Sequence, residues 1–483
     1  MTQWFKNLRY IPIKSVLVTF FILCALPTGL MMVCITPPGQ VPDESAHLAR
    51  AEGLLHGALL AERRVVLSRL TGRPALKAEV QVDQGLYAVT FQGDTSRIDG
   101  RPVVTRQDFQ ALMALPADHR RILVNISNTG TYFPAAYVPA TLGLALGRAT
   151  HAPPYACLLL ARLFMLATFL VLGALALILA SFGEAALLTL LILPMTLFLA
   201  GSINQDGVLI AASCLSCAML TRGTKGYRLL AMGMMVVFLG AKPPYVLLLG
   251  IFLLPLSGAG FLRRLRDVVI AGLPLLFWVG LISLFVVVPF SKAAYLPGPL
   301  YTGDGSVMMY ATNAGANLHI LLAQPSRLLS LPWHAAAQHG VSWLQQMIGV
   351  LGNLQIVLPD RYYLSWGFAL LVAFSGVALG PRPAQPPAQI WADCLFTGLV
   401  VLSTCWLILI SLYVCWTPVG LDHIEGLQGR YLLPILPVLL FAIPAWPSRL
   451  RLHPLLAAIP SMILGMVGLI YVPMKLLWAY YLY

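Results

Sequence analysis

The feature that most constrains this chain is a series of apolar runs of roughly 20 residues that recur along most of its length. A run of that length forms a helix that crosses the ~30 Å hydrocarbon core of a bilayer and satisfies its own backbone hydrogen bonds there. The mean hydropathy of +0.80 and the 10% share of charged residues exclude an ordinary soluble domain. The sequence therefore predicts an all-α integral membrane protein with many spans, whose main partner is the lipid bilayer.

The net charge of +13 falls in short clusters beside the apolar runs. A nucleic-acid-binding protein would carry its Lys and Arg along one soluble face, so no nucleic-acid partner is expected. Under the positive-inside rule the clusters mark cytoplasmic connections. The basic residues ahead of the first run accordingly place the N-terminus in the cytoplasm.

If the chain crosses the membrane so that these basic clusters lie in the cytoplasm, it has about 11 spans. The predicted spans are 15–35, 155–180, 185–201, 208–220, 229–240, 245–257, 268–290, 364–380, 395–413, 432–446 and 455–474. The apolar stretches 134–149 and 347–358 are not counted, because a crossing there would move later basic clusters outside. We interpret 347–358 as an interfacial helix, although the sequence leaves open whether either stretch spans.

The predicted organisation has five parts, with both long loops on the outer face. They are a cytoplasmic N-terminus and first transmembrane helix (1–35), a first outer loop with an acidic motif and a small insertion (36–153), spans 2–7 (154–290), a second outer loop (291–362) and spans 8–11 (363–483). Within the first loop, residues 61–121 regain charge, and 86–91 alternate as a strand does. The insertion is marginal as an independent domain, so we expect it to pack on the membrane part.

Two adjacent carboxylates follow the first span, where prolines and a glycine end the helix. Asp43 is a favourable N-cap for a second helix that runs from Glu44 to Leu55. On that helix Asp43, His47 and Arg50 recur at i, i+4 and i+7 and share one face. Capping alone is the simplest interpretation of Asp43; a polar face turned toward a cavity is the functional one.

Further polar residues fall at the predicted outer ends of other spans. They are Asn204, Asp206, Lys242, Gln428, Arg430 and Tyr431. Ionisable residues at membrane depth are usually functional, and the two cations run against the positive-inside rule. We therefore predict that these residues converge with Asp43 in one site open to the exterior.

Four motifs carry a resemblance to a known group of proteins. They are Pro-Asp-Glu-x-x-His at 42–47, Ser-Ile-Asn-Gln-Asp-Gly at 202–207, Lys-Pro-Pro-Tyr at 242–245 and Gly-Leu-Gln-Gly-Arg-Tyr-Leu-Leu-Pro at 426–434. The set resembles an uncharacterised bacterial membrane-protein family of the GT-C glycosyltransferase superfamily. The resemblance implies a GT-C-like bundle in the bacterial inner membrane with a periplasmic active site. It also implies a polyprenyl-phosphate-linked sugar donor and a cell-envelope glycan or glycolipid acceptor.

By this resemblance Asp43 is the catalytic base and Glu44 its catalytic neighbour. Asp206 positions a sugar, a phosphate-bound partner or a metal, while Lys242 and Arg430 hold the donor phosphate. The expected substrate-binding residues are His47, Arg50, Asn204, Asp206, Lys242, Gln428, Arg430 and Tyr431. Transfer of a sugar to a hydroxyl needs one carboxylate to take the proton and cations to stabilise the leaving phosphate, so an inverting single displacement is expected.

Several alternatives stay open at this point. A divalent cation, Mg²⁺ or Mn²⁺, can be held by Asp43, Glu44 and Asp206, although no dense carboxylate cluster points to one, and no metal is assigned. A transporter or flippase of lipid-linked sugars is disfavoured because the spans are almost free of charge and no inverted repeat is visible. An O-antigen ligase or polymerase, which uses a lipid-diphosphate donor, and a non-catalytic scaffold are the other candidates.

Overall fold

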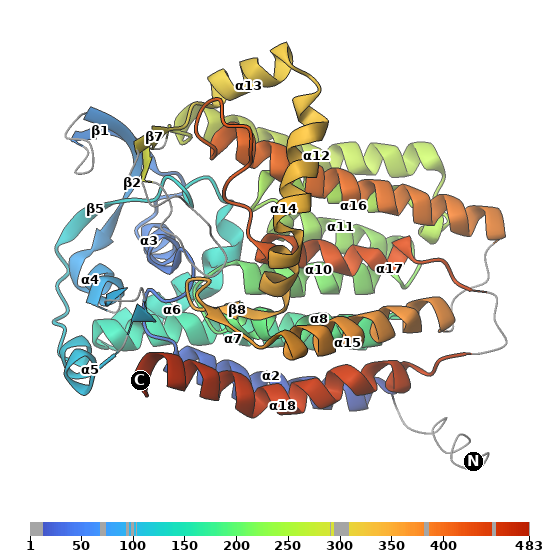
Figure 1. Ribbon diagram of the computed structural model, residues 1–483, viewed down its shortest axis with the longest axis horizontal. Helices are drawn as coiled ribbons and strands as arrows, with labels where there is room; N and C mark the ends of the chain where they lie inside the picture. The colour runs from blue at the N-terminus through green and yellow to red at the C-terminus, as the bar shows by residue number, and fades with distance from the viewer. Residues whose placement is uncertain are drawn as a thin grey trace.

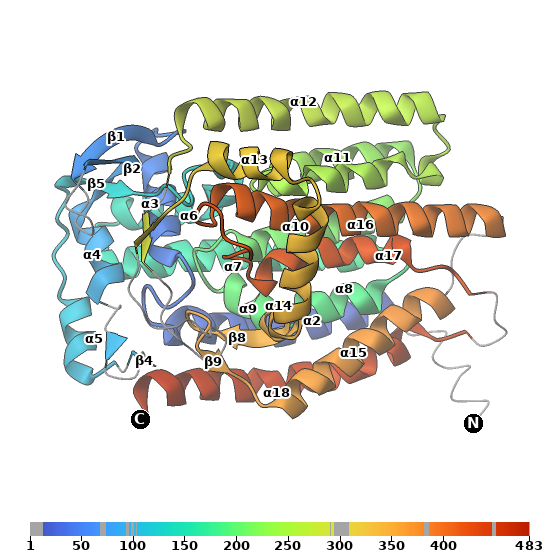
Figure 2. The ribbon, with the colours of Figure 1, turned by 45° about the horizontal axis from the view of Figure 1, so that its top comes forward.

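The structure, a computed structural model, describes residues 13–67, 74–92, 96–97, 101–102, 104–289, 291–293, 309–380, 386–446 and 451–482. Long helices lie side by side in a bundle, with a small sheet at one end (Figures 1 and 2). In the described part, six helices are long and apolar enough to cross a membrane. They are α2 (Ile13–Ile35), α7 (Pro154–Leu179), α12 (Phe261–Phe285), α15 (Asp360–Leu379), α16 (Pro387–Cys415) and α18 (Pro454–Tyr481).

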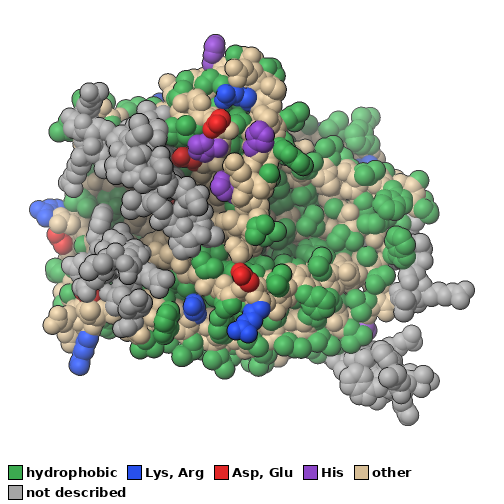
Figure 3. All heavy atoms as spheres, viewed as in Figure 1, with side chains coloured by type: hydrophobic (Ala, Val, Ile, Leu, Met, Phe, Trp, Pro, Cys, Tyr) green, Lys and Arg blue, Asp and Glu red, His purple; other side chains and the backbone are tan. Residues whose placement is uncertain are grey.

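The outer surface of these helices is strongly apolar. Leu262 and Phe277 on α12, Leu364 on α15 and Leu395 on α16 are all more than two thirds exposed. Figure 3 shows hydrophobic side chains over the bundle and few charged ones. So much exposed apolar surface suits contact with lipid rather than water, which agrees with the predicted integral membrane protein.

Shorter helical segments occupy the other predicted spans. They are α8 (Glu184–Leu191), α9 (Pro194–Ala200), α10 (Asp206–Leu220), α11 (Lys225–Leu239), the 3₁₀ segments η2 (Pro243–Leu253), η3 (Pro255–Ser257) and η4 (Gly429–Val438), and α17 (Leu439–Ala442). Pro194 separates α8 from α9, and Pro434 and Pro437 deprive η4 of backbone donors, which favours the tighter winding. The total of eleven spans stays a prediction.

Basic side chains join three helix ends at one end of the bundle. Lys14, at the start of α2, donates to the Ile178 carbonyl near the end of α7 at 2.8 Å. Arg222, just after α10, donates to the Leu179 carbonyl at 2.6 Å. Cations at helix C-termini are favourable because they face the negative end of the helix dipole. The start of α2 thus lies beside the ends of α7 and α10, so α2 is antiparallel to α7, and α7 and α10 run in the same direction.

A sheet and short helices cover the opposite end. The sheet has antiparallel strands in the order β1 (Glu62–Leu67), β2 (Pro74–Asp83) and β5 (Arg121–Asn125), and around it lie α3 (Glu44–Leu55), α4 (Gln84–Gln92), α5 (Arg106–Met113), η1 (Pro134–Tyr137) and α6 (Val138–Ala149). Ala78 and Val80 of β2 share a buried cluster with Trp278 and Ile282 of α12. The insertion therefore packs on the membrane part, as predicted.

The remaining elements are short strand pairs and two helices. They are β3 (Ser96–Arg97) with β4 (Arg101–Pro102), β6 (Ser291–Ala293) with β7 (Met309–Ala311), β8 (Val350–Leu351) with β9 (Ile356–Val357), α13 (Ala314–Ala323) and α14 (Arg327–Gly349). Helix α14 crosses the long helices in both views. It packs on η4, where Gly429 lies against Trp343, and on α9, where Gly349 lies against Pro194.

Two local predictions in the segments expected to be outer loops are wrong. Residues 86–91 form part of helix α4 rather than a strand, because Leu86 and Val89, three residues apart, are buried on one helical face. Residues 347–358 do not form an interfacial helix: α14 ends at Gly349, and β8 and β9 form a hairpin. Gly352 and Leu354, both at positive φ, make the turn between those strands.

Helix α6 matches the uncounted stretch 134–149. It has 12 residues, about 18 Å of helix, which is shorter than the hydrocarbon core. Gly143 lets it lie directly against the α7 backbone, since a Cβ there would meet Ala161 and the Leu160 carbonyl. Whether this stretch spans the membrane stays open.

Candidate functional site

Asp43 lies between α2 and α3 in an unusual backbone conformation. Its φ of 62° and ψ of 15° are left-handed, which for a residue other than glycine costs on the order of 1 to 3 kcal/mol. Its side chain makes no capping hydrogen bond to α3. Instead Oδ2 accepts from Arg430 Nη2 at 2.9 Å, and Oδ1 accepts from Asn128 Nδ2 at 3.2 Å. Asp43 therefore occupies the N-cap position of α3, which begins at Glu44 as predicted, but its side chain contacts Arg430 and Asn128 instead of capping the helix.

Four charged side chains from four segments form a chain of alternating sign. Arg430 lies between the carboxylates of Asp43 and Asp206, with its Nε 3.6 Å from Asp206 Oδ2. Lys242 Nζ then donates to Asp206 Oδ1 at 2.6 Å. The exposed fractions of the side chains are 38% for Asp43 but only 1%, 2% and 11% for Arg430, Asp206 and Lys242. The chain of charges thus runs from a solvent-accessible carboxylate into the protein interior.

Backbone contacts hold the ends of these segments together. Asn204, just before α10, accepts from the Asp206 N–H and donates to the Pro42 carbonyl at 3.2 Å. Arg430 donates to the same carbonyl at 3.4 Å. Gly429 lies so close to α14 that an added Cβ would collide with the Trp343 carbonyl. Its lack of a side chain therefore serves helix packing, and that packing sets the position of Arg430.

Aromatic rings line the buried cations. The Tyr431 ring centroid lies 4.0 Å from Lys242 Nζ and 5.2 Å from Arg430 Cζ. The Tyr132 ring, 6.0 Å from Lys242 Nζ, lies at the outer limit for a cation–π contact. Tyr245 donates to the Tyr431 backbone carbonyl at 2.6 Å and so fixes the backbone that carries this ring. These rings stabilise the two cations without adding negative charge.

His47 lies buried beneath the charge chain, one helical turn after Asp43. Its Nδ1 and Tyr137 Oη form a hydrogen bond of 2.6 Å, and its ring stacks on Tyr132. Burial lowers the pKa of His47 to about 4, an effect that the charge of Asp43 only partly opposes. The imidazole is therefore neutral at physiological pH.

This burial predicts that the protein loses stability in mild acid. Because the folded pKa of about 4 lies below the ordinary value of 6.5, the unfolded chain binds more protons between these values. We expect the free energy of unfolding to fall by on the order of 3 kcal/mol as the pH drops from 6.5 to 4. Thermal unfolding of detergent-solubilised protein across this pH range measures the loss of stability. A His47→Gln variant should show a weaker pH dependence; an unchanged dependence would contradict this assignment.

Three of the predicted site residues lie apart from the charge chain. Glu44 forms a fully buried bidentate ion pair with Arg162 of α7, at 2.8 and 2.7 Å. Arg50 is buried and donates to the Ala58 and Leu59 carbonyls rather than to a carboxylate. Gln428 Oε1 is buried and has no hydrogen-bond partner among the described residues. The catalytic role of Glu44 and the binding roles of Arg50 and Gln428 stay predictions, and the first two positions favour structural roles.

The three carboxylates considered as Mg²⁺ or Mn²⁺ ligands each face a cation. Asp43 contacts Arg430, Asp206 contacts Lys242, and Glu44 contacts Arg162. In the described part of the chain they do not form a group that could hold one ion. The arrangement therefore gives no support for a metal at this position.

Some members of the site were not singled out from the sequence. Tyr132, Tyr137 and Asn128 belong to a loop without a charged residue, so no ionisable side chain marked them. Arg162 was also overlooked, although a charged residue inside a long apolar run is a recognisable signal. Its partner, 118 positions earlier, is set by how α2, α3 and α7 pack.

The bundle, its lipid-suited surface and the polar site at one end define a multi-pass helical membrane protein with a buried charge network. The chain belongs to the family described as predicted membrane protein (DUF2142), which matches residues 26–439. That range includes all four members of the charge chain. Comparison with curated proteins and with solved structures finds no match.

Proposed function

We propose that this protein is a GT-C-type glycosyltransferase of the bacterial inner membrane. It moves a sugar from a polyprenyl-phosphate donor to a cell-envelope glycan or glycolipid on the periplasmic face. The observation that carries the proposal is a solvent-accessible carboxylate, Asp43, held 2.9 Å from a buried arginine, Arg430. A base beside a fixed cation is what transfer from a phosphate leaving group requires.

The proposed reaction is a single displacement with inversion. The acceptor hydroxyl oxygen attacks the anomeric carbon, and the bond between that carbon and the phosphate oxygen breaks. The hydroxyl proton passes to the Asp43 carboxylate, and the bonding electron pair leaves with the polyprenyl phosphate. The proton then returns to solvent through the exposed face of Asp43.

Arg430 couples the two halves of this reaction. In the resting site its charge is shared between Asp43 and Asp206, so the four side chains sum to zero charge. When Asp43 takes the proton, its carboxyl group becomes neutral and its attraction for Arg430 weakens. The guanidinium can then bind the departing phosphate. Positive charge is thus supplied at the moment when negative charge develops on the leaving group.

Lys242 and Asp206 serve this arrangement from the interior. Asp206 contacts both cations, and its negative charge offsets the repulsion between them. Tyr431 covers both cations and excludes water from one side of them. Fixed cations in a water-poor site stabilise charge more strongly than the same groups in bulk water.

The test is transfer of a labelled sugar by purified protein in lipid vesicles. Donors linked through polyprenyl phosphate and through polyprenyl diphosphate are offered with an envelope-glycan extract as acceptor. Product formed only from the monophosphate donor supports the proposal, whereas use of the diphosphate donor alone indicates a ligase or polymerase. Movement of the lipid-linked sugar across the bilayer without transfer would assign the protein to the transporters and overturn the proposal.

Replacing Arg430 by Gln should lower the transfer rate by about 10² to 10³, the usual cost of losing one preorganised charge-stabilising group. Arg430→Lys should recover part of this loss, because it keeps the charge without the bidentate geometry. The matched control is Arg64→Gln, which removes an exposed, ion-paired arginine on β1. Initial rates per folded protein measure the effect, and a full rate in Arg430→Gln would remove this residue from the mechanism.

A further inference from the structure

We infer that the protein has a divalent transition-metal site, of the kind that takes Zn²⁺, at the far end of α3. The ligands are Glu52 on α3, His56 at the C-cap position directly after α3, and Asp83 at the end of β2. This site is separate from the charge chain that Asp43 begins, and the inference does not depend on the proposed function.

The three side chains converge on one point. Glu52, in the last turn of α3, and the C-cap residue His56 are four residues apart, so their side chains lie on the same side of the helix end. His56 Nε2 lies 3.3 Å from Glu52 Oε1 and 3.4 Å from Asp83 Oδ1, and one ligand atom from each residue falls within 4.8 Å of the others. Ligand atoms around a tetrahedral zinc ion lie about 3.3 to 3.6 Å apart, given bonds of about 2.0 to 2.2 Å. The three groups thus already have the spacing of a metal site.

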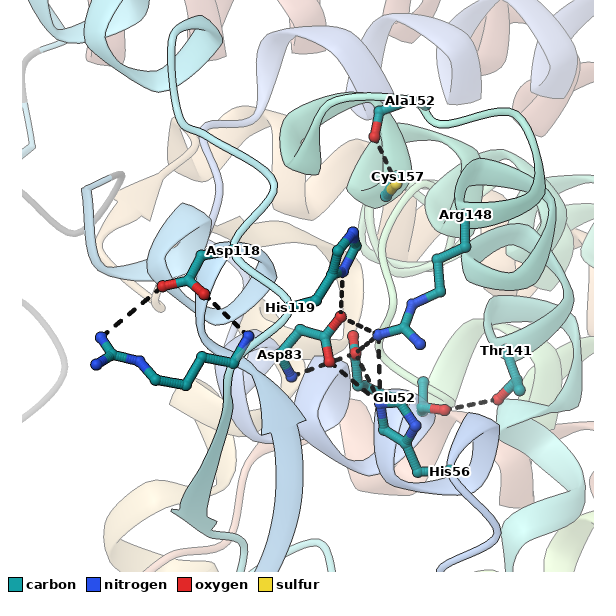
Figure 4. Close-up of polar contacts among 11 residues, drawn as sticks. Glu52, His56, Asp83, Asp118, His119, Thr141, Arg148, Ala152 and Cys157 are labelled. Atoms are coloured by element: carbon teal, nitrogen blue, oxygen red, sulfur yellow. Dashed lines mark hydrogen bonds and ion pairs between the residues drawn. The ribbon is translucent and has the colours of Figure 1, made fainter.

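A cationic nitrogen already lies where these ligands meet. Arg148 Nη2, from α6, is 2.7 Å from Glu52 Oε1 and 3.3 Å from His56 Nε2, and it also contacts Asp83 Oδ2. Figure 4 shows these side chains meeting around the guanidinium group. Arg148 therefore marks a position that the protein builds for positive charge, and it is the group that a metal ion would displace.

Two observations indicate that Arg148 does not satisfy this position. Two buried carboxylates, those of Glu52 and Asp83, face the single guanidinium of Arg148. Glu52 Oε2 is buried and has no hydrogen-bond partner among the residues that the structure describes. An unpaired buried carboxylate oxygen is costly, and a second positive charge on a metal ion would compensate it.

The surroundings provide a fourth ligand and a route of entry. His119 Nδ1 lies 2.9 Å from Asp83 Oδ2 and its side chain is largely exposed, so it can either orient Asp83 or turn to bind the ion. A cavity of about 80 Å³ lies beside Arg148 and is lined by Asp83, His119 and His151. Arg148 is itself 29% exposed, so its side chain can leave toward solvent.

The ligand types indicate which metal is bound. Imidazole together with carboxylates suits zinc and its neighbours in the first transition row, whereas Mg²⁺ and Ca²⁺ prefer oxygen ligands alone. The bound ion would join the end of α3 to β2. Because α3 carries both Asp43 and His47 at its other end, the metal would hold the helix that presents the proposed base.

Zinc binding by the purified, tag-free full-length protein tests this inference. We expect one Zn²⁺ per chain after dialysis against Zn²⁺ alone, and no comparable retention of Mg²⁺ or Ca²⁺. His56→Ala and Asp83→Asn should each weaken zinc binding by at least about tenfold. The matched control, His334→Ala, removes an exposed imidazole on α14 and should leave it unchanged. Zinc binding that persists in both ligand variants would overturn the inference.

Two further measurements test the inference even if the ligand variants do not fold. Arg148→Met removes the competing cation, so it should bind Zn²⁺ more tightly than the wild-type protein does. If this cluster is only an ion-pair network, that variant binds no zinc and melts at a lower temperature. Co²⁺ added to the wild-type protein should produce the visible absorption bands of a four-coordinate site. Absence of zinc from the wild-type protein together with absence of these bands would overturn the inference without any variant.

Discussion

Asparagine in place of Asp43 is expected to lower the rate of sugar transfer by about 10² to 10⁴, the range for loss of a general base. Asparagine keeps the size of the side chain and an acceptor oxygen for Asn128 and Arg430, but it cannot take the hydroxyl proton. It also leaves the charge of Arg430 only partly compensated, so donor binding should not weaken. The expected signature is thus a reduced turnover number with a nearly unchanged KM for the polyprenyl-phosphate donor.

The matched control for Asp43→Asn is another carboxylate-to-amide substitution on the same side of the protein. Glu62→Gln removes an exposed carboxylate of β1 that pairs with Arg64 and should leave transfer unaffected. Both variants should melt at temperatures close to that of the wild-type protein, because neither carboxylate is fully buried. Turnover by Asp43→Asn at the rate of Glu62→Gln would remove Asp43 as the base.

Arg162→Met is expected to destabilise the protein by about 3 to 5 kcal/mol, because it leaves the buried Glu44 carboxylate without its cation. Arg162 also donates to the Val33 and Thr36 carbonyls at 3.0 and 2.7 Å, so its loss frees acceptors at the end of α2. Glu44→Gln should destabilise in the same way, since it leaves a buried guanidinium without its counter-ion. Thermal and denaturant unfolding in detergent measure both variants.

The double variant separates an ion pair from two independent contributions. If Glu44 and Arg162 act as a pair, the double variant loses less stability than the sum of the single losses. Additive losses would contradict the pairing. Sugar transfer per folded molecule should survive Glu44→Gln far better than Asp43→Asn, although the two acids are adjacent in the chain. Equal loss of transfer in both variants would instead support a catalytic role for Glu44.

Local signals in the sequence were sufficient to predict the structure at the start of the segment that follows α2. The prolines and glycine before Asp43 end one helix, and the following segment forms α3 from Glu44 to Leu55 as predicted. The convergence of Asp43, Asp206, Lys242 and Arg430 was also expected, because all four fall at the predicted outer ends of spans. The structure brings these four side chains into contact.

Predictions failed where a short segment has no strong periodicity of its own. Residues 86–91 alternate like a strand, but packing against its neighbours selects the helix α4. Residues 347–358 are apolar enough for a helix, yet two residues at positive φ turn them into the β8–β9 hairpin. In both cases tertiary contacts outweigh a weak local preference.

The sequence by itself determined that this is a membrane protein of many helices, which ends carry basic residues, and where one acidic helix begins. These properties depend on hydrophobic length, charge and helix-ending residues, all of which act locally. Only the tertiary structure decided that Asp43 faces Arg430 while Glu44 faces Arg162, and that Glu52, His56 and Asp83 meet. A buried charge takes the partner that helix packing brings near it, because leaving it unpaired costs several kcal/mol. Sequence spacing along one helix cannot specify a partner that lies more than a hundred residues away.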